Sequence, residues 1–129
     1  MLKSEQKLIQ ILRKNDPGLF KLGKYDVVDC FSPKYYQHLE LKCRKGSWND
    51  WGIEKEKYDK IILYPNIRYV VWGDNGLWSW DLMQTPVPKW VWTYGPTQTE
   101  FSDEQVWEWK WVAKIHVTYA QDLKYLLTK

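Results

Sequence analysis

The stretch "QHLELKCRKG", residues 37–46, alternates apolar and charged side chains. Leu39 and Leu41 share one side of an extended chain, and Glu40 and Lys42 share the other. An alternation of period two is typical of a β-strand with one buried face. The stretch therefore predicts a strand that carries a carboxylate and an ammonium group side by side on its second face.

The segments around this strand predict a single domain, residues 1–129, of mixed α/β class. A capped amphipathic pattern predicts the first helix, and an Asn-Gly turn between two β-rich runs predicts a hairpin. The expected elements are a helix over 4–14, strands over 24–31 and 36–44, a helix over 53–65, a hairpin over 67–82, a short strand over 89–94, a long strand over 106–119 and a helix over 120–129.

Composition argues against several classes of protein. No stretch approaches the roughly 20 apolar residues that cross a bilayer, and no N-terminal apolar run indicates a signal peptide. Cys30 and Cys43 match no spacing typical of a zinc site. We therefore expect a cytoplasmic protein with reduced cysteines and no membrane partner.

Charge is distributed unevenly along the chain. Residues 1–45 contain ten Lys and Arg against five Asp and Glu, whereas residues 46–129 contain nine against eleven. A basic first part favours a polyanionic partner such as nucleic acid.

Tryptophan is unusually frequent, with ten in 129 residues. In the long predicted strand, Trp107, Trp109 and Trp111 share a side with Ala113 and Ile115. We expect this side to pack in the core, although aromatic side chains also stack on bases or sugars.

The spacing Asp/Glu-x-Lys occurs four times, so the tripeptide alone does not indicate a site. The four pairs are Glu5–Lys7, Glu40–Lys42, Glu108–Lys110 and Asp122–Lys124. On a helix, positions i and i+2 diverge, which disfavours the first and last pairs. Only the pair at residue 40 follows a separate predicted strand that carries acids of its own.

Two carboxylates on neighbouring strands, with a lysine beside them, can hold Mg²⁺ and promote phosphodiester hydrolysis. Cross-strand side chains lie about 5 Å apart. Pairing Asp26 with Glu40 centres the turn on Pro33, where a turn is expected; Asp29 on the same strand is the alternative partner.

At these residues the chain resembles the PD-(D/E)xK nucleases, the superfamily of restriction endonucleases, Holliday-junction resolvases and small phage nucleases. The segments "KYDVVDCF", "HLELKCR", "WGIEKEKYDKIIL" and "YVVWGDNGLWSWDL" carry the resemblance, over about residues 24–82. It implies a restriction-endonuclease-like core, in which a central mixed, mostly antiparallel sheet is flanked by helices.

The resemblance implies the following roles. Asp26 and Glu40 would bind Mg²⁺, for which Mn²⁺ can substitute, and the backbone carbonyl of Leu41 would complete the ligand set. Lys42 would be the catalytic lysine that positions the attacking water. The products would be 5′-phosphate and 3′-hydroxyl ends.

The match departs from the family at one position and leaves the first ligand open. The usual proline before the first Asp is Tyr25 here, so Asp29 remains a rival to Asp26. Some members also use an acid of the first helix, which would be Glu5.

The resemblance also implies a substrate. DNA is the expected partner, with RNA left open, and its phosphates would contact basic residues on and after the motif strand: Arg44, Lys45, Lys55 and Lys57. A small enzyme of this kind would cut by structure or without specificity, in phage DNA processing or recombination inside an infected bacterial cell. The family also makes a homodimer an option.

Two other functions compete with the nuclease. A non-catalytic nucleic-acid-binding domain of the same fold would use the same basic face without holding metal. A sugar-binding module would use the tryptophans, but such modules usually present aromatic side chains on a weakly charged face.

Overall fold

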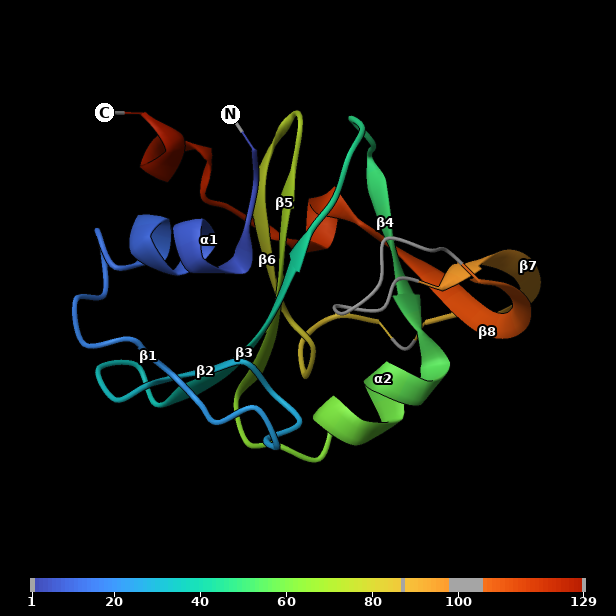
Figure 1. Cartoon of the computed structure of the whole chain (residues 1–129), viewed down its shortest axis with the longest axis horizontal. Helices are drawn as coiled ribbons and strands as arrows, with labels where there is room; N and C mark the ends of the chain where they lie inside the picture. The colour runs from blue at the N-terminus through green and yellow to red at the C-terminus, as the bar shows by residue number, and fades with distance from the viewer. Residues whose placement is uncertain (1, 87, 98–105, 129) are drawn as a thin grey trace.

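The computed structural model describes residues 2–86, 88–97 and 106–128. In this part of the chain, nine strands form two sheets, and two α-helices lie against them. Figure 1 shows helix α1 (Glu5–Leu12) near both chain ends, and helix α2 (Lys55–Ile61) on the other side of the molecule. The expected mixed α/β class is confirmed.

The larger sheet has six strands in the order β1-β2-β3-β5-β6-β9. Their bounds are β1 Phe20–Lys21, β2 Cys30–Ser32, β3 Gln37–Cys43, β5 Ile67–Gly73, β6 Gly76–Asp81 and β9 Gln121–Asp122. Strand β3 is antiparallel to β2 but parallel to β5, because β4 (Asp50–Glu54) and α2 form a crossover between β3 and β5.

The smaller sheet has the order β4-β8-β7, with β7 at Val91–Thr97 and β8 at Val106–His116. Strand β8 pairs along its C-terminal half with β4 and along its N-terminal half with β7. As a result, the β7–β8 ribbon extends away from the main sheet, at the right of Figure 1.

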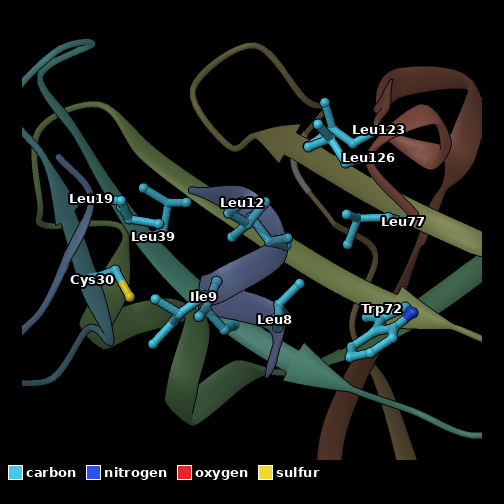
Figure 2. Packing of buried hydrophobic residues seen from close by; sticks show 12 residues of the cluster. Leu8, Ile9, Leu12, Leu19, Cys30, Leu39, Trp72, Leu77, Leu123 and Leu126 are labelled. Carbon is cyan, nitrogen blue, oxygen red and sulfur yellow. The ribbon is translucent and has the colours of Figure 1, made fainter. Parts of the chain in front are cut away.

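The core consists of two apolar clusters, one associated with α1 and the other with the small sheet. Near α1, Leu8, Ile9 and Leu12 pack on Leu41 and Val70 of the main sheet, as Figure 2 shows for the helix side chains. The second cluster joins the opposite side of the main sheet to the small sheet: Ile67, Tyr69, Val71 and Trp80 lie with Trp51, Ile53, Ala113 and Ile115.

Local signals explain the elements that the sequence predicts correctly. Ser4 Oγ accepts a hydrogen bond of 3.1 Å from the Lys7 N–H and so caps α1. The hairpin of β5 and β6 turns at Asp74 and Asn75, and β7 and β8 occupy the last two predicted strands.

Three expected elements differ from the structure. The predicted helix over 53–65 begins only at Lys55, because residues 50–54 pair with β8 as strand β4. The predicted C-terminal helix is replaced by β9 and a 3₁₀ turn at Lys124–Leu127. Of the predicted strand over 24–31, only its last two residues lie in β2. Each difference depends on contacts with distant strands, which local patterns do not encode.

In the part of the chain that the structure describes, no helix combines the length and apolarity needed to cross a membrane.

Candidate active site

Strand β3 divides its side chains between the two core clusters. Leu39 and Leu41 are buried against α1, whereas Glu40 and Lys42 project from the opposite face. The alternation expected from the sequence is therefore confirmed. Glu40 is only 2% exposed, so this face is not an ordinary solvated surface. Burying a carboxylate is costly unless neighbouring groups stabilise it.

Asp29 lies beside Glu40. The antiparallel register of β2 and β3 pairs Cys30 with Leu39. Asp29 precedes Cys30 and Glu40 follows Leu39, so the two acids lie opposite each other. The Asp29 N–H donates to the Leu39 carbonyl at 3.0 Å, and Asp29 Oδ2 accepts from the Leu41 N–H at 2.8 Å. The carboxylate of Asp29 is thus fixed against β3.

The register that pairs Asp26 with Glu40 is wrong. Asp26 is exposed and lies in a turn before β2, where its N–H donates to the Gly23 carbonyl at 2.9 Å. The apolar residues of this segment do not require a strand, because Val28 enters the core from the loop. The sequence left Asp26 and Asp29 as alternative partners of Glu40, and the structure places Asp29 beside it.

Two lysines approach the same oxygen of Glu40. Lys42 Nζ lies 3.8 Å and Lys57 Nζ 3.3 Å from Glu40 Oε2. Lys42 follows on β3, as expected from the motif, and Lys57 comes from α2. We expected Lys57 to contact phosphate; its proximity to the buried carboxylate depends on the crossover that seats α2, which no local pattern predicts.

The neighbourhood of Glu40 keeps its proton strongly bound. Burial, followed by the negative charge of Asp29, raises the pKa of Glu40 to about 8, although Lys57 and Lys42 act in the opposite direction. As a carboxylate, Glu40 Oε1 accepts no hydrogen bond from the residues that the structure describes. The side chains of Glu40 and Asp29 are within hydrogen-bonding reach, so a proton held by Glu40 can lie between them, and a bound cation could replace that proton.

The donor set fits a hard divalent cation. The Leu41 carbonyl leaves β3 on the same side as the Leu41 N–H, which points to Asp29. Two carboxylates and one carbonyl are oxygen ligands of the kind Mg²⁺ prefers, and they leave positions for water and phosphate. Among the described residues, no group of three or more His, Cys, Asp and Glu side chains could hold a metal. The fit therefore depends on this smaller set.

A basic pocket of about 280 Å³ opens beside these groups, between β3 and the small sheet. Its cationic lining residues are Lys42, Arg44, Lys57 and Lys110. The buried Tyr69 hydroxyl donates to the Gly52 carbonyl at 3.0 Å and ties β4 to the pocket floor. Burial raises the pKa of Tyr69 to about 12, while the nearby Arg44 guanidinium lowers it.

The other predicted residues lie apart from the pocket. Lys55 forms an ion pair of 2.6 Å with Asp59, and Lys45 is exposed in the loop after β3. Glu5 Oε1 lies 4.0 Å from Lys21 Nζ. Glu5 also contributes to raising the thiol pKa of Cys30, which belongs to the cluster around α1. Among the predicted phosphate contacts, Arg44 and Lys57 are therefore the ones that line the pocket.

A larger pocket, of about 390 Å³, lies on the α1 side of the main sheet. Arg68 and Asp16 contribute to its lining, but Asp29, Glu40 and Lys42 do not. We place the candidate site at the smaller pocket because the buried acid and its lysines adjoin that one.

The chain matches no protein-family model, and no curated protein matches it in sequence.

The raised pKa of Glu40 predicts how stability depends on pH. Its ordinary pKa is 4.5, so between pH 4.5 and about 8 the folded protein retains a proton that the unfolded chain has lost. The stabilisation is complete below pH 4.5 and declines as the pH rises toward 8. Replacing Glu40 by Gln should remove this decline, which amounts to at most about 1.4 kcal/mol per pH unit.

Urea unfolding of the metal-free protein at pH 5 and pH 8 measures this difference. The wild-type free energy of unfolding should fall by a few kcal/mol more than that of Glu40→Gln. Glu56→Gln is the matched control, because the Glu56 side chain is 85% exposed. If the free energy of unfolding changed with pH in the same way for the wild type and Glu40→Gln, the raised pKa of Glu40 would be contradicted.

Proposed function

We propose that this protein is a Mg²⁺-dependent endonuclease that hydrolyses phosphodiester bonds in DNA. The observation that carries the proposal is a buried glutamate, Glu40, with a second acid and two lysines around it, next to a basic pocket. Ionisable groups with strongly shifted pKa values beside a cleft are typical of catalytic sites.

The chain connectivity supports the same proposal. The resemblance implies an acid on one strand, the E-x-K motif on the next, then a helix with a lysine and a hairpin. Here β2 follows directly on Asp29, β3 carries Glu40 and Lys42, α2 carries Lys57, and β5 and β6 form the hairpin. Strand β3 sits in the middle of the main sheet, where both neighbours hold it rigidly.

Asp29, Glu40 and the Leu41 carbonyl would hold the Mg²⁺. When bound, the ion would act as a Lewis acid toward phosphate and lower the pKa of a bound water. The ion would have to displace the proton that lies between the two acids. Because this proton is bound less tightly at higher pH, ion binding should become stronger as the pH approaches 8.

The cationic side chains would act on the substrate. Lys42, on the motif strand, would orient the attacking water and offset the negative charge that develops on the phosphoryl oxygens. Arg44, which lines the pocket, would bind a phosphate beside the scissile bond. Lys57 would keep Glu40 ionised once the ion has displaced the proton.

The proposed substrate is DNA recognised by its structure or without specificity, as in phage DNA processing. A single pocket of this size leaves little surface for reading a base sequence, and the contacts it offers are to phosphate.

Supercoiled plasmid provides the test. Purified protein with Mg²⁺ should convert the plasmid to nicked and linear forms that carry 5′-phosphates, whereas excess EDTA should abolish cleavage. A protein that binds the plasmid in EDTA, with a steep salt dependence, but never cuts it with Mg²⁺ or Mn²⁺ would be the non-catalytic binder instead.

A further inference from the structure

One face of the β7–β8 ribbon is covered by aromatic side chains that stay in contact with solvent. We call it the aromatic face; it consists of Trp92, Tyr94, Trp107, Trp109 and Trp111. Each of these side chains is about half exposed, between 48% and 57%. Large apolar side chains in contact with water usually mark a surface that another molecule covers.

The five rings form a continuous array. Trp92 stacks on Trp109, with 6.1 Å between ring centroids and 14° between planes, and its ring lies 5.1 Å from that of Trp111. Tyr94 continues the array to Trp109 at 5.4 Å and to Trp107 at 5.6 Å. Rings that brace one another lose little side-chain entropy when a partner binds.

The aromatic face lies on the same side of β8 as the residues that this strand contributes to the second core cluster. Farther along β8, Ala113 and Ile115 point to the same side and are 2% and 3% exposed. Along β8, the residues on this side are therefore buried where the strand pairs with β4 and exposed where it pairs with β7. The expectation that all of these tryptophans pack in the core is wrong for Trp107, Trp109 and Trp111.

The area suits a protein partner. Half of the roughly 200 Å² that an aromatic side chain can bury, over five side chains, is on the order of 500 Å². A standard protein interface covers about 800 Å² on each partner, with an apolar centre and a polar rim. The aromatic face supplies such a centre.

The charges beside the aromatic face disfavour nucleic acid. Trp92, Trp109 and Trp111 border a hollow whose charged lining residues are Glu54, Glu56, Asp59, Glu108, Lys55 and Lys110. Acids outnumber lysines there, and each lysine pairs with an acid: Lys55 with Asp59 and Lys110 with Glu54. A phosphate backbone would meet a net negative surface.

The ribbon also separates the aromatic face from the candidate site. Thr93, Gly95 and Lys110 alternate with the aromatic residues along the two strands, and these three line the basic pocket. A base stacked on the aromatic face would therefore lie across the ribbon from the side chains that line the basic pocket.

We propose that the aromatic face binds a second copy of this chain. The two ribbons pack aromatic face against aromatic face across a twofold axis, so that each array of rings covers the other. A twofold interface needs a self-complementary surface, and an array of rings with no net charge of its own meets this requirement. If the proposed function holds, the pairing leaves both basic pockets on outer surfaces, where each can act on one DNA strand.

Sedimentation of the metal-free protein without DNA tests the dimer independently of any nuclease activity. At concentrations of tens of micromolar, wild type should sediment with twice the chain mass of 15.7 kDa. A charge placed among the rings by Trp109→Glu should weaken association about 30-fold or more. Tyr119→Glu is the matched control and should remain dimeric, because Tyr119 has the same 57% exposure but lies off the ribbon.

A second variant, Tyr94→Glu, and far-ultraviolet circular dichroism separate dissociation from misfolding. Folded, monomeric Trp109→Glu and Tyr94→Glu beside a dimeric control support the proposal. A wild type that stays monomeric up to about 100 µM overturns it. Loss of single-stranded DNA binding in EDTA by a monomeric Trp109→Glu would overturn it as well, and would assign the aromatic face to nucleic acid.

Discussion

Replacing Asp29 by Asn should reduce Mg²⁺-dependent plasmid cleavage about 10³-fold, because several kcal/mol of metal-derived stabilisation would be lost. Asn retains the side-chain oxygen that accepts the Leu41 N–H at 2.8 Å, so the contact of β3 with Asp29 should survive. What the substitution removes is one negative charge beside Glu40. Cleavage rates at several Mg²⁺ concentrations measure the effect.

Asp26→Asn is the matched control for this substitution. Asp26 lies three positions earlier and is exposed in a turn, so its loss should leave the cleavage rate within about twofold of wild type. An inactive Asp26→Asn beside an active Asp29→Asn would show that the pairing of Asp29 with Glu40 plays no part in catalysis.

Replacing Lys42 by Ala should reduce the cleavage rate about 10²–10³-fold, the usual effect of removing one group that stabilises charge in a transition state. Lys42 Nζ lies 3.8 Å from Glu40 Oε2, and the side chain lines the basic pocket. Since two carboxylates and a carbonyl remain, Mn²⁺ binding should persist. The combination of retained metal and lost activity distinguishes a catalytic lysine from a structural one.

Lys55→Ala serves as the control for Lys42→Ala. Lys55 is paired with Asp59 on the surface of α2 and should tolerate removal with little change in rate. Equal nicking by wild type and Lys42→Ala would refute the role of Lys42, whatever the metal dependence of the reaction.

The central strand of the fold was predictable because its signal is local. The alternation of Leu39 and Leu41 with Glu40 and Lys42 defines β3 and the face that each side chain occupies. Helix α1 was predictable for the same reason, since its cap and apolar stripe are contained in one short segment.

The partner of Glu40 was harder to predict. Asp26 and Asp29 are three residues apart, so they would lie on opposite faces of an extended strand, and the expected turn at Pro33 favoured Asp26. The hydrogen bonds of Asp29 to Leu39 and Leu41 decide between them, and such register contacts appear only once two strands have paired. The approach of Lys57 to Glu40 depends in the same way on where α2 packs.

The alternation of side chains along β8 also could not distinguish buried positions from exposed ones. Trp109 and Ile115 occupy equivalent positions in the alternation of β8, yet one is 57% and the other 3% exposed. The difference arises because β4 and the main sheet cover only the second half of β8. Coverage is a property of the whole fold, which periodicity along one strand does not record.

The proposed activity depends on a divalent cation held between Asp29 and Glu40 with Lys42 beside it. A crystal soaked in Mn²⁺ tests this most directly, because the ion is located by its anomalous scattering. We expect one peak about 2 Å from carboxylate oxygens of both residues and from the Leu41 carbonyl. A well-ordered crystal with no peak there, or with its manganese bound at Asp26, would contradict the account.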